Sequence, residues 1–471
     1  MSHILSKKSL ANILSASIND TNSDLCGQGV EFNSKEVKPG QIFFALKGSK
    51  NHGHDYLQDA LSKGAALAIV EDPKFLKDSR IGDQILVVED SLKALQSLAS
   101  HLRNNFKGKV VGVAGSVGKT TTKDLLGNIS SQLFPSSWSK KSFNNLLGLS
   151  YTICNADPSD KLWVLELGMN HEGELAELSL MAKPDLAIIT QIAPEHMEFF
   201  RDLNHVADAE FEVLAGLKDD GELLLNSEDL VAFSALTKNI QHRNKSKIKV
   251  QPFGFGDKSE LLATNFKHVI DGELKGSFSL ESKTENCTIK TNLIGRHNAG
   301  NFSAAFLALK ILFPELKLSR ISEVVETIPP SPMRLNQITL PNGALIIDDS
   351  YNSSPVAVAA AINIMKEIKD AGREVVLVLG DMYELGDSAK QYHLNLVPLI
   401  VELAPSLVVT FGPLAQNIST ELSRLGSKAV HAQSIEEVTS LVKNNTAKVI
   451  LFKASRGVGL DRAVKILLQP Q

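Results

Sequence analysis

The sequence has few cysteines, little net charge and no long hydrophobic run, and each shortage excludes a class of protein. Its three cysteines, Cys26, Cys154 and Cys287, lie far apart without metal-like spacing, which indicates thiols in a reducing compartment rather than a disulfide framework. A formal net charge of −4 gives no support for bulk nucleic-acid binding. No run approaches the ~18 apolar residues of a membrane span, and the N-terminus lacks the apolar core of a signal peptide. We therefore expect a cytoplasmic protein with no nucleic-acid partner and no membrane insertion, and we also expect a monomer.

The length of 471 residues is too great for a single core, so the chain should divide into domains. The clearest boundary is PPSPM (329–333), because prolines disfavour regular structure around them. We expect an α/β protein with three domains, at residues 1–105, 106–325 and 326–471.

Alternating apolar strands and helical stretches predict parallel sheets in the second and third domains. LWVLELG, DLAIITQI and GELLLN are apolar runs suited to strands that are buried on both faces. Residues 246–294 predict an antiparallel excursion, since GSFSLES and CTIKTNL are short alternating segments. The third domain should be Rossmann-like, with the strands ALIIDDSYN, REVVLVLGDM, SLVVTFG and KVILFKASR. The first domain indicates a small α/β binding module that ends in a bridging helix, SLKALQSLASHLRNNF.

The stretch Val110–Asp124, VVGVAGSVGKTTTKD, predicts a phosphate-binding loop between a strand and a helix. In the general pattern G-x-x-x-x-G-K-[ST] the first glycine would be at Val113, but here it is one residue earlier, at Gly112. A glycine turn without a ligand is the alternative, yet Gly-Lys-Thr at a strand-to-helix switch favours a nucleoside triphosphate. The loop residues expected at the phosphates are Gly115, Ser116, Val117, Gly118, Lys119, Thr120 and Thr121.

Several acidic residues and a histidine follow these strands, where an open α/β sheet places its ligands. Glu166 ends LWVLELG and is a candidate Mg²⁺ ligand, although a carboxylate facing solvent is the alternative. His196 follows DLAIITQI in the corresponding position, where metal binding and a structural role are equally open. Glu210 and Glu212 lie two apart on the next helix, so at most one of them should reach the loop.

Asparagines and basic residues near turns are further candidates. The pair Asn144–Asn145 has the composition of a turn. Asn298 and Asn301 share one helix face, either as caps or as contacts to a base. Three basic residues would neutralise a transferring phosphoryl group if the last domain closes on the nucleotide, and are otherwise surface charges: Arg334, Lys453 and Arg456.

Taken in order, these motifs resemble the Mur ligases of peptidoglycan synthesis over nearly the whole chain. KPGQIFFALKGSKNHGHDYLQDALSKGA resembles the family's N-terminal UDP-sugar-binding domain, and GVAGSVGKTT matches the family's own loop, G-x-x-G-x-x-G-K-T. The remaining motifs follow in the family's order: FNNLLGL, LELGMN, IAPEHMEFF, GRHNAGN, IIDDSYNSSP, LGDMYELG and FKASRG. Each motif alone is weak, but their shared order is specific.

The resemblance implies an ADP-forming ligase that joins a carboxylate to an amine with ATP and Mg²⁺. IIDDSYNSSP replaces the Asp-Asn-Pro-Arg motif of diamino-acid-adding members, which favours the branch that adds D-alanyl-D-alanine. In that branch the terminal carboxylate of UDP-MurNAc-tripeptide attacks the γ-phosphate, and the amine of D-alanyl-D-alanine then attacks the acyl phosphate. The product is UDP-MurNAc-pentapeptide. Phosphoryl transfer of this kind needs cations and positioning more than a protein nucleophile.

The resemblance also implies roles for the residues that match the family's motifs. Lys119 would hold the γ-phosphate and Arg334 would contact the phosphates, while the Mg²⁺ ligands would be Thr120, Glu166 and His196. Adenine would contact Asn298 and Asn301, and the ribose would contact Asp349. The uridine end would be lined by Ser34, Gly48 and His54, and the muramoyl group by Asn145. The incoming amine or the phosphates would face Asn352, Ser455 and Arg456.

Two positions depart from the family pattern. Ala114 replaces the threonine that usually opens the loop, which should be a mild change. In the family's V-A-x-A-K-x-E helix, CO₂ carbamylates the lysine and its new carboxylate helps to position Mg²⁺. Here Glu210 occupies the lysine position. Because glutamate carries a carboxylate without modification, we expect Glu210 to replace the carbamate, through a bridging water if its shorter side chain requires one.

Three other readings remain open at this point. A diamino-acid-adding member would run the same chemistry with another amine. A folylpolyglutamate synthetase shares the core but begins close to its phosphate loop, whereas here about 105 residues precede it. A non-catalytic ATP-binding switch is suggested by the glutamate at position 210, although Lys119, Thr120, Glu166 and His196 argue against it.

Overall fold

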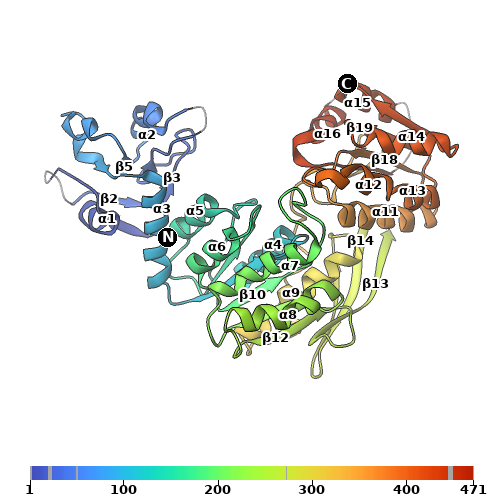
Figure 1. The fold of residues 1–471 in the computed structure, drawn as a ribbon, viewed down its shortest axis with the longest axis horizontal. Coiled ribbons are helices and arrows are strands. Elements are labelled where there is room, and N and C mark those ends of the chain that lie inside the picture. Colours follow the sequence, from blue (N-terminus) through green and yellow to red (C-terminus); the bar gives the residue numbers. More distant parts are fainter. Residues whose placement is uncertain (1–2, 20–23, 49–50, 272, 444–448, 470–471) are drawn as a thin grey trace.

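The computed structural model describes residues 3–19, 24–48, 51–271, 273–443 and 449–469. Its strands form three larger sheets in three successive stretches of the chain, and a two-stranded pair lies near the N-terminus. Figure 1 shows the first and last of these sheets on opposite sides of the central one. No helix within these ranges is long and apolar enough to cross a membrane. The predicted α/β class is confirmed.

The first sheet is parallel, with the order β3-β4-β5-β6. Its strands are β3 (Val30–Glu31), β4 (Ile42–Phe44), β5 (Leu67–Val70) and β6 (Ile85–Val87), and the antiparallel pair is β1 (Ile4–Ser6) and β2 (Cys26–Gln28). Its helices are α1 (Lys7–Leu14), α2 (Leu57–Ser62) and α3 (Ser91–Asn105). The carboxylate of Asp90 caps α3 by accepting the N–H groups of Leu92 and Lys93, as expected for a residue that precedes a helix.

The central sheet has nine strands in the order β15-β14-β13-β12-β11-β10-β7-β9-β8. The parallel strands are β7 (Lys109–Ala114), β8 (Ser136–Trp138), β9 (Leu162–Glu166), β10 (Leu186–Ile189), β11 (Glu222–Asn226) and β12 (Lys249–Gly254). The predicted antiparallel excursion is confirmed in β13 (Leu261–Asp271), β14 (Glu273–Glu281) and β15 (Asn286–Thr291). Apolar side chains of β7 and β9 to β11 are fully buried because helices cover both faces. The helices are α4 (Lys119–Leu133), α5 (Leu146–Asn155), α6 (Glu174–Ala182), α7 (Leu203–Glu210), α8 (Leu230–His242), α9 (Arg296–Leu312) and α10 (Leu318–Ser322).

The last sheet has the order β16-β17-β21-β18-β19-β20 and is parallel except for its edge strand β16. The strands are β16 (Asn336–Thr339), β17 (Leu345–Asp349), β18 (Val375–Gly380), β19 (Leu407–Phe411), β20 (Ala429–Ala432) and β21 (Val449–Lys453). The helices are α11 (Pro355–Asp370), α12 (Ala389–Leu394), α13 (Val397–Leu403), α14 (Gln416–Arg424), α15 (Ile435–Lys443) and α16 (Asp461–Leu468). This is the predicted Rossmann-like unit.

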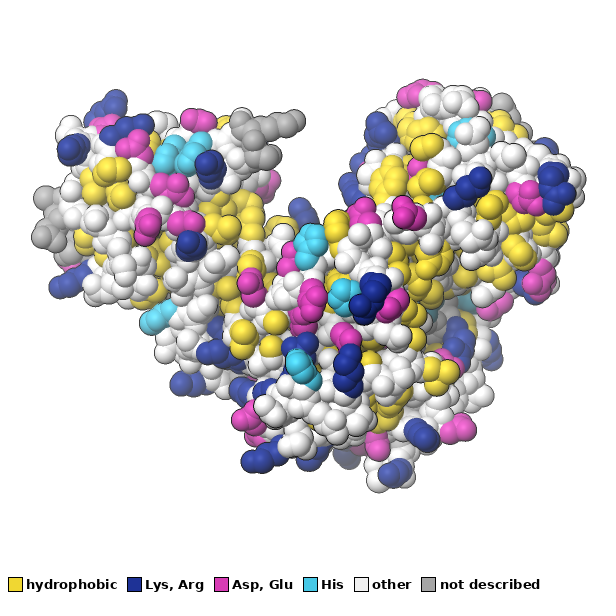
Figure 2. Space-filling view, in the orientation of Figure 1, with side chains coloured by type: hydrophobic (Ala, Val, Ile, Leu, Met, Phe, Trp, Pro, Cys, Tyr) yellow, Lys and Arg dark blue, Asp and Glu magenta, His cyan; other side chains and the backbone are white. Residues whose placement is uncertain are grey.

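The bridging helix α3 is anchored on the central unit. The guanidinium of Arg103, which is 4% exposed, donates to the carbonyls of Ala182 at 2.5 Å and Lys183 at 2.6 Å, at the end of α6. Phe106, just after α3, stacks on Trp163 of β9 with ring centroids 3.6 Å apart. These contacts attach the end of α3 to the central unit. Figure 2 shows that the surface is hollowed between the first unit and the last one.

The last unit is docked on the central one through side chains on both sides. Ser331 donates to Asp124 at 2.6 Å, and the Tyr351 hydroxyl donates to Ser142 at 2.8 Å. The Nδ1 atom of His268, on β13, lies 2.6 Å from a carboxylate oxygen of Glu367 on α11. In Figure 1, β13 and β14 accordingly reach up to α11. The central and last units thus enclose the carboxyl ends of the central strands.

Candidate active site

The predicted phosphate loop connects β7 to α4, and its glycines are required by geometry. Gly115 has a φ of +114°, and a Cβ there would lie 2.4 Å from the Thr190 hydroxyl oxygen. Gly118 has a φ of +98°, and a Cβ there would lie 3.1 Å from Oδ1 of Asn301. Glycine adopts positive φ angles of this kind without steric cost. The close approach of Thr190 therefore selects glycine at the start of the loop.

Backbone N–H groups early in the loop are already bound within the protein. Gly115 donates to Oε2 of Glu210 at 2.7 Å, while Ser116 and Val117 both donate to the Gln191 carbonyl, at 2.8 and 3.3 Å. The first N–H groups of α4, from Lys119 onward, have no intrahelical acceptor and lie at the positive end of the helix dipole. In this conformation the N–H groups at the start of α4 are therefore more available to an anion than those of Gly115, Ser116 and Val117.

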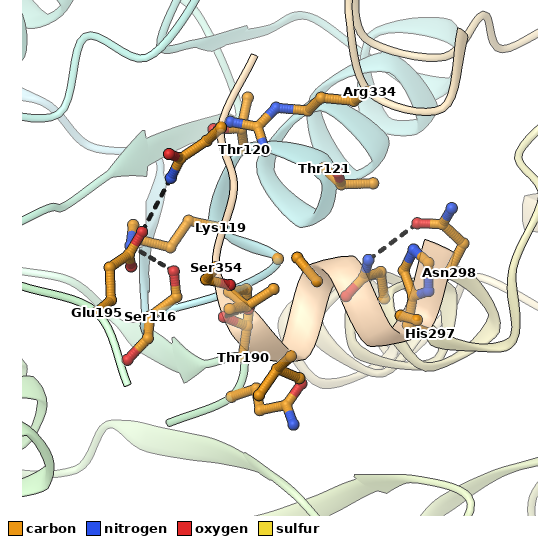
Figure 3. A pocket seen from close by; sticks show the side chains of 18 of the residues that line it. Ser116, Lys119, Thr120, Thr121, Thr190, Glu195, His297, Asn298, Arg334 and Ser354 are labelled. Carbon is orange, nitrogen blue, oxygen red and sulfur yellow. Dashed lines mark hydrogen bonds and ion pairs between the residues drawn. The ribbon is translucent and has the colours of Figure 1, made fainter. Parts of the chain in front are cut away.

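The Lys119 ammonium is surrounded by oxygen atoms of the loop and of Glu195. It donates to the carbonyls of Gly115 and, at 3.0 Å, Ser116, and it lies 3.6 Å from Oε2 of Glu195. Figure 3 shows Glu195 and Ser116 beside it. Burial alone would lower the pKa of Lys119, but three carboxylates outweigh burial and raise it: Glu195, Glu210 and Glu166. Lys119 thus stays charged in the cavity.

Thr120 joins Glu166 of the central unit to Arg334 of the last one. Its hydroxyl donates to Oε1 of Glu166 at 3.1 Å and accepts from Nη2 of Arg334 at 3.0 Å. Figure 3 shows the Arg334 guanidinium pointing at Thr120. Burial raises the pKa of Glu166, and surrounding cations oppose that rise. The arrangement brings a hydroxyl, a carboxylate and a cation to the start of α4.

Two neighbours of Glu166 have roles that the sequence did not predict: Lys123 was not a candidate, and Asn144 was expected only as part of a turn. Lys123, which is fully buried, lies 3.7 Å from Oε2 of Glu166, and Asn144 donates to Oε1 at 3.2 Å. Lys123 occurs one helical turn after Lys119, on the same face of α4, and that spacing was the available signal. Asn145, the residue predicted for substrate contact, caps α5 by accepting the Gly148 N–H at 2.9 Å and also lines the cavity.

The donor set fits Mg²⁺ only if the ion shares its ligands with phosphate. Within the described ranges no group of three or more His, Cys, Asp or Glu side chains could hold a metal by itself. The oxygen atoms of Thr120 and Glu166 are the hard ligands that Mg²⁺ prefers, and Mg²⁺ commonly binds through one or two carboxylates plus substrate phosphates. The buried Oε2 of Glu166 has no hydrogen-bond partner among the described residues, although the Lys123 ammonium lies 3.7 Å from it.

His196 lies in the same cavity but is engaged by the last unit. Its Nδ1 atom is 2.5 Å from Oε2 of Glu384, and its backbone has a φ of 55°. Burial alone would lower the pKa of His196, but the contact with the Glu384 carboxylate and the charge of Glu195 outweigh burial and raise it. The pKa of Glu384 is lowered by the same pair. The two residues therefore form an ionic contact between the units.

Glu210, at the end of α7, lies beneath the loop and does not line the cavity. Its carboxylate accepts the Gly115 N–H and is 3% exposed, and burial raises its pKa to about 7. Glu212 turns away and accepts the N–H groups of Gly173 and Ala176 at the start of α6. Only one of the two glutamates reaches the loop, as their spacing predicts.

A cavity of about 1010 Å³ brings most of the predicted site residues together, at the boundary of the central and last units. It is lined by the loop residues Ser116 to Thr121 and by Asn145, Glu166, His196, Asn298, Asn301, Arg334, Asp349 and Asn352. Asn301 donates to Asn298 at 3.1 Å, and Lys453 lies 2.6 Å from Asp349. Ser455 and Arg456 line a smaller adjoining pocket of about 120 Å³. Gly115 and Glu210 support the loop from behind.

The three residues predicted for the uridine end lie in the first unit, away from this cavity. The Ser34 carbonyl accepts from Lys63 at 3.0 Å, and the Gly48 N–H donates to the Asn51 carbonyl at 3.0 Å. Nε2 of His54 accepts the Glu71 N–H at 3.0 Å, and burial lowers the pKa of that imidazole. Ser34, Gly48 and His54 therefore each take part in a hydrogen bond within the first unit, and their contacts with substrate stay predictions.

Comparison with known proteins identifies the family. Three family models match successive parts of the chain: "Mur ligase family, catalytic domain" at residues 28–103, "Mur ligase middle domain" at 113–309 and "Mur ligase, glutamate ligase domain" at 333–456. A Rickettsia prowazekii protein named UDP-N-acetylmuramoyl-tripeptide–D-alanyl-D-alanine ligase is 32% identical over 94% of this chain and 96% of its own length. The chain belongs to the Mur ligase family.

Other Mur ligases agree over the same span. The Bacillus subtilis protein of the same name is 32% identical, covering 94% of this chain and 93% of its own. The crystal structure of MurF from Acinetobacter baumannii superposes with a TM-score of 0.83 at 26% identity and covers 100% of both chains. MurF from Thermotoga maritima, solved in complex with ADP, has a TM-score of 0.75 at 25% identity, covering 93% of this chain and 96% of that one. The expected family and its three-domain fold are confirmed.

Proposed function

We propose that this Mur ligase is an ATP-dependent, ADP-forming ligase that adds D-alanyl-D-alanine to UDP-N-acetylmuramoyl-tripeptide through an acyl phosphate. The relatives matched over nearly their whole length carry the name of that reaction. The observation that carries the proposal is the contact of Arg334 with Thr120, because it brings a cation of the last unit to the phosphate loop of the central one. An isolated nucleotide-binding module would not need that contact.

The residues of the cavity suit phosphoryl transfer. Lys119 and Arg334 supply positive charge from two sides, and fixed charges of this kind stabilise the charge that develops on a transferring phosphoryl group. Asn298 and Asn301 present amides on one wall of the cavity for a base, and Asp349 presents a carboxylate for a ribose. Lys453, 2.6 Å from Asp349, holds that carboxylate in place.

Thr120 and Glu166 would hold Mg²⁺ together with the phosphates, and His196 is the third predicted ligand. The ion would supply charge neutralisation at the phosphates. Lys123 and Asn144 fix the Glu166 carboxylate, since a cation and an amide contact its two oxygen atoms. For His196 to take part, its ring must turn from Glu384, with which it is paired here.

The first unit would bind the uridine end of the substrate through Ser34, Gly48 and His54. The tripeptide would then cross the hollow seen in Figure 2 toward the phosphate loop. Asn352, Ser455 and Arg456 would receive the amine, because they line the cavity and the pocket that adjoins it. We propose a cytoplasmic location, which the three free cysteines favour, and a monomer.

The experiment that tests the proposal is a product assay with competing amines. The first mixture contains purified protein, ATP, Mg²⁺, UDP-MurNAc-tripeptide and D-alanyl-D-alanine. The second contains the same protein, ATP and Mg²⁺ with UDP-MurNAc-dipeptide and a diamino acid. Mass spectrometry should detect the pentapeptide product from the first mixture only. A product from the second mixture would assign the chain to the diamino-acid-adding branch instead.

A further inference from the structure

The pocket beside the main cavity is lined by side chains of both charges. Glu195 and Glu384 line both cavities, and Arg456 lines the smaller one, where its Nη1 atom also lies 3.2 Å from Oδ1 of Asp461. The smaller pocket, of about 120 Å³, adjoins the main cavity of about 1010 Å³ at Glu195 and Glu384, so the two together have room for a small zwitterion whose ammonium lies at the carboxylates.

Of these two acidic residues, Glu384 has a close ion-pair partner and Glu195 does not. Glu384 is paired with His196 at 2.5 Å. Glu195 accepts a hydrogen bond from Asn352 at 3.0 Å through Oε1, but its buried Oε2 has no hydrogen-bond partner among the described residues. The Lys119 ammonium lies 3.6 Å from Oε2. This side chain is 13% exposed, so its charge is costly to leave uncompensated.

From this geometry we propose that Glu195 is the docking group for the ammonium of the incoming amine substrate. In the structure the carboxylate already has an ammonium beside it, that of Lys119. When Lys119 turns to a nucleotide phosphate, Oε2 loses that cation while Asn352 still holds Oε1. The substrate ammonium replaces Lys119, and the substrate carboxylate faces Arg456. The inference rests on the proposed function and assigns Glu195 as a specificity-determining residue for the amine.

The exchange couples the two sites. A phosphate that draws Lys119 away strengthens the attraction of Glu195 for an ammonium, and removal of the Glu195 charge frees Lys119 for the phosphate. The two Michaelis constants should therefore move in opposite directions in Glu195→Gln. The Gln side chain keeps an oxygen that can accept the Asn352 hydrogen bond, so the loop geometry is retained.

The test measures steady-state kinetics of Glu195→Gln with each substrate varied in turn. We expect KM for D-alanyl-D-alanine to rise about tenfold to a hundredfold, the range for a lost hydrogen bond to a charged group. KM for ATP should fall. With hydroxylamine, which is largely uncharged at neutral pH, the rate of hydroxamate formation should equal that of the wild type. Glu177→Gln, an exposed carboxylate on α6, is the matched control and should change none of these values.

The outcomes separate this role from a structural one. If both KM values rise together, or if hydroxamate formation falls with amide formation, Glu195 only shapes the loop and the inference is overturned. Unchanged kinetics with D-alanyl-D-alanine would overturn it equally. Glu195→Asp, which keeps the charge, should retain a KM for the dipeptide closer to that of the wild type. A wild-type protein that forms no product would overturn the proposed function itself, and the inference with it.

Discussion

At the scale of single residues, the least expected feature is the buried carboxylate of Glu210 under the phosphate loop. The related ligases carry a lysine at this position by the pattern of their motif, and here the glutamate accepts the Gly115 N–H. The carboxylate is therefore part of the encoded sequence and needs no CO₂ to form. It lies behind the loop instead of lining the cavity, so any influence on the metal must pass through the loop or through water.

We therefore predict that activity does not depend on CO₂ or bicarbonate, and that Glu210→Ala loses it. Alanine leaves the Gly115 N–H without its acceptor, which costs about 1–3 kcal/mol at a buried site and loosens the loop. ADP release should be compared in degassed and bicarbonate-supplemented buffers, with Glu210→Gln as the variant that retains an acceptor oxygen. Full activity of Glu210→Ala would contradict this account.

The raised pKa of Glu210 also predicts a pH-dependent stability. Its pKa rises from 4.5 to about 7 on folding, mainly through burial. The folded state therefore favours the protonated carboxyl, and this contribution is fully present below pH 4.5 and is lost as pH rises through about 7. At pH 8 the charged form costs about 3 kcal/mol relative to a neutral group.

The measurement is the thermal midpoint of the wild type and of Glu210→Gln at pH 5 and pH 8. Glutamine is neutral at both pH values, so the variant should gain stability over the wild type on going to pH 8. A difference that stays constant between the two pH values would show that Glu210 does not titrate in this range.

At the scale of elements, the phosphate loop depends on how closely β10 approaches it. Gly115→Ala places a methyl group 2.4 Å from the Thr190 hydroxyl oxygen at a positive φ, so the loop must shift. We expect a loss of about 1–3 kcal/mol in stability and a weaker affinity for ATP, measured by calorimetry. Gly173→Ala is the control, because that residue also has a positive φ but no atom within 4 Å of the added Cβ. Equal effects of both variants would assign the cost to φ alone.

The sequence predicts elements better than it predicts contacts. The loop, the buried parallel strands and the antiparallel excursion were all predicted, because each depends on local spacing and periodicity. The short strands β16 and β20 were missed, since four residues carry little periodicity. Lys123 and Glu195 were also missed as site residues, and Asn144 was expected only as part of a turn. Their positions depend on how loops from separate strands fold together, which no local pattern records.

At the scale of the whole molecule, the central and last units are joined by a contact that depends on pH. His196 has a raised pKa and Glu384 a lowered one, each with the other as a main partner. The Glu384 contribution is present above its ordinary pKa and is lost as pH falls through its folded value. The His196 contribution is present below its ordinary pKa of 6.5 and is lost as pH rises through its raised one.

We therefore expect the two units to separate more often at pH 9 than at pH 6. Small-angle scattering of the nucleotide-free protein should show a larger radius of gyration at the higher pH. Glu384→Gln removes the acidic partner and should show a smaller dependence on pH. A radius that is the same at both pH values in the wild type would show that the remaining contacts, such as Arg334 to Thr120, hold the units together alone.

The central claim is that the docked units form one ligase site, and the most direct test is the substrate dependence of ADP release. ATP and Mg²⁺ are supplied with UDP-MurNAc-tripeptide, with D-alanyl-D-alanine, with both or with neither. The account predicts rapid ADP and phosphate release only when both are present, and its loss in Arg334→Ala. Equal ADP release with neither substrate present would contradict it, because the protein would then be an ATP-driven switch and not a ligase.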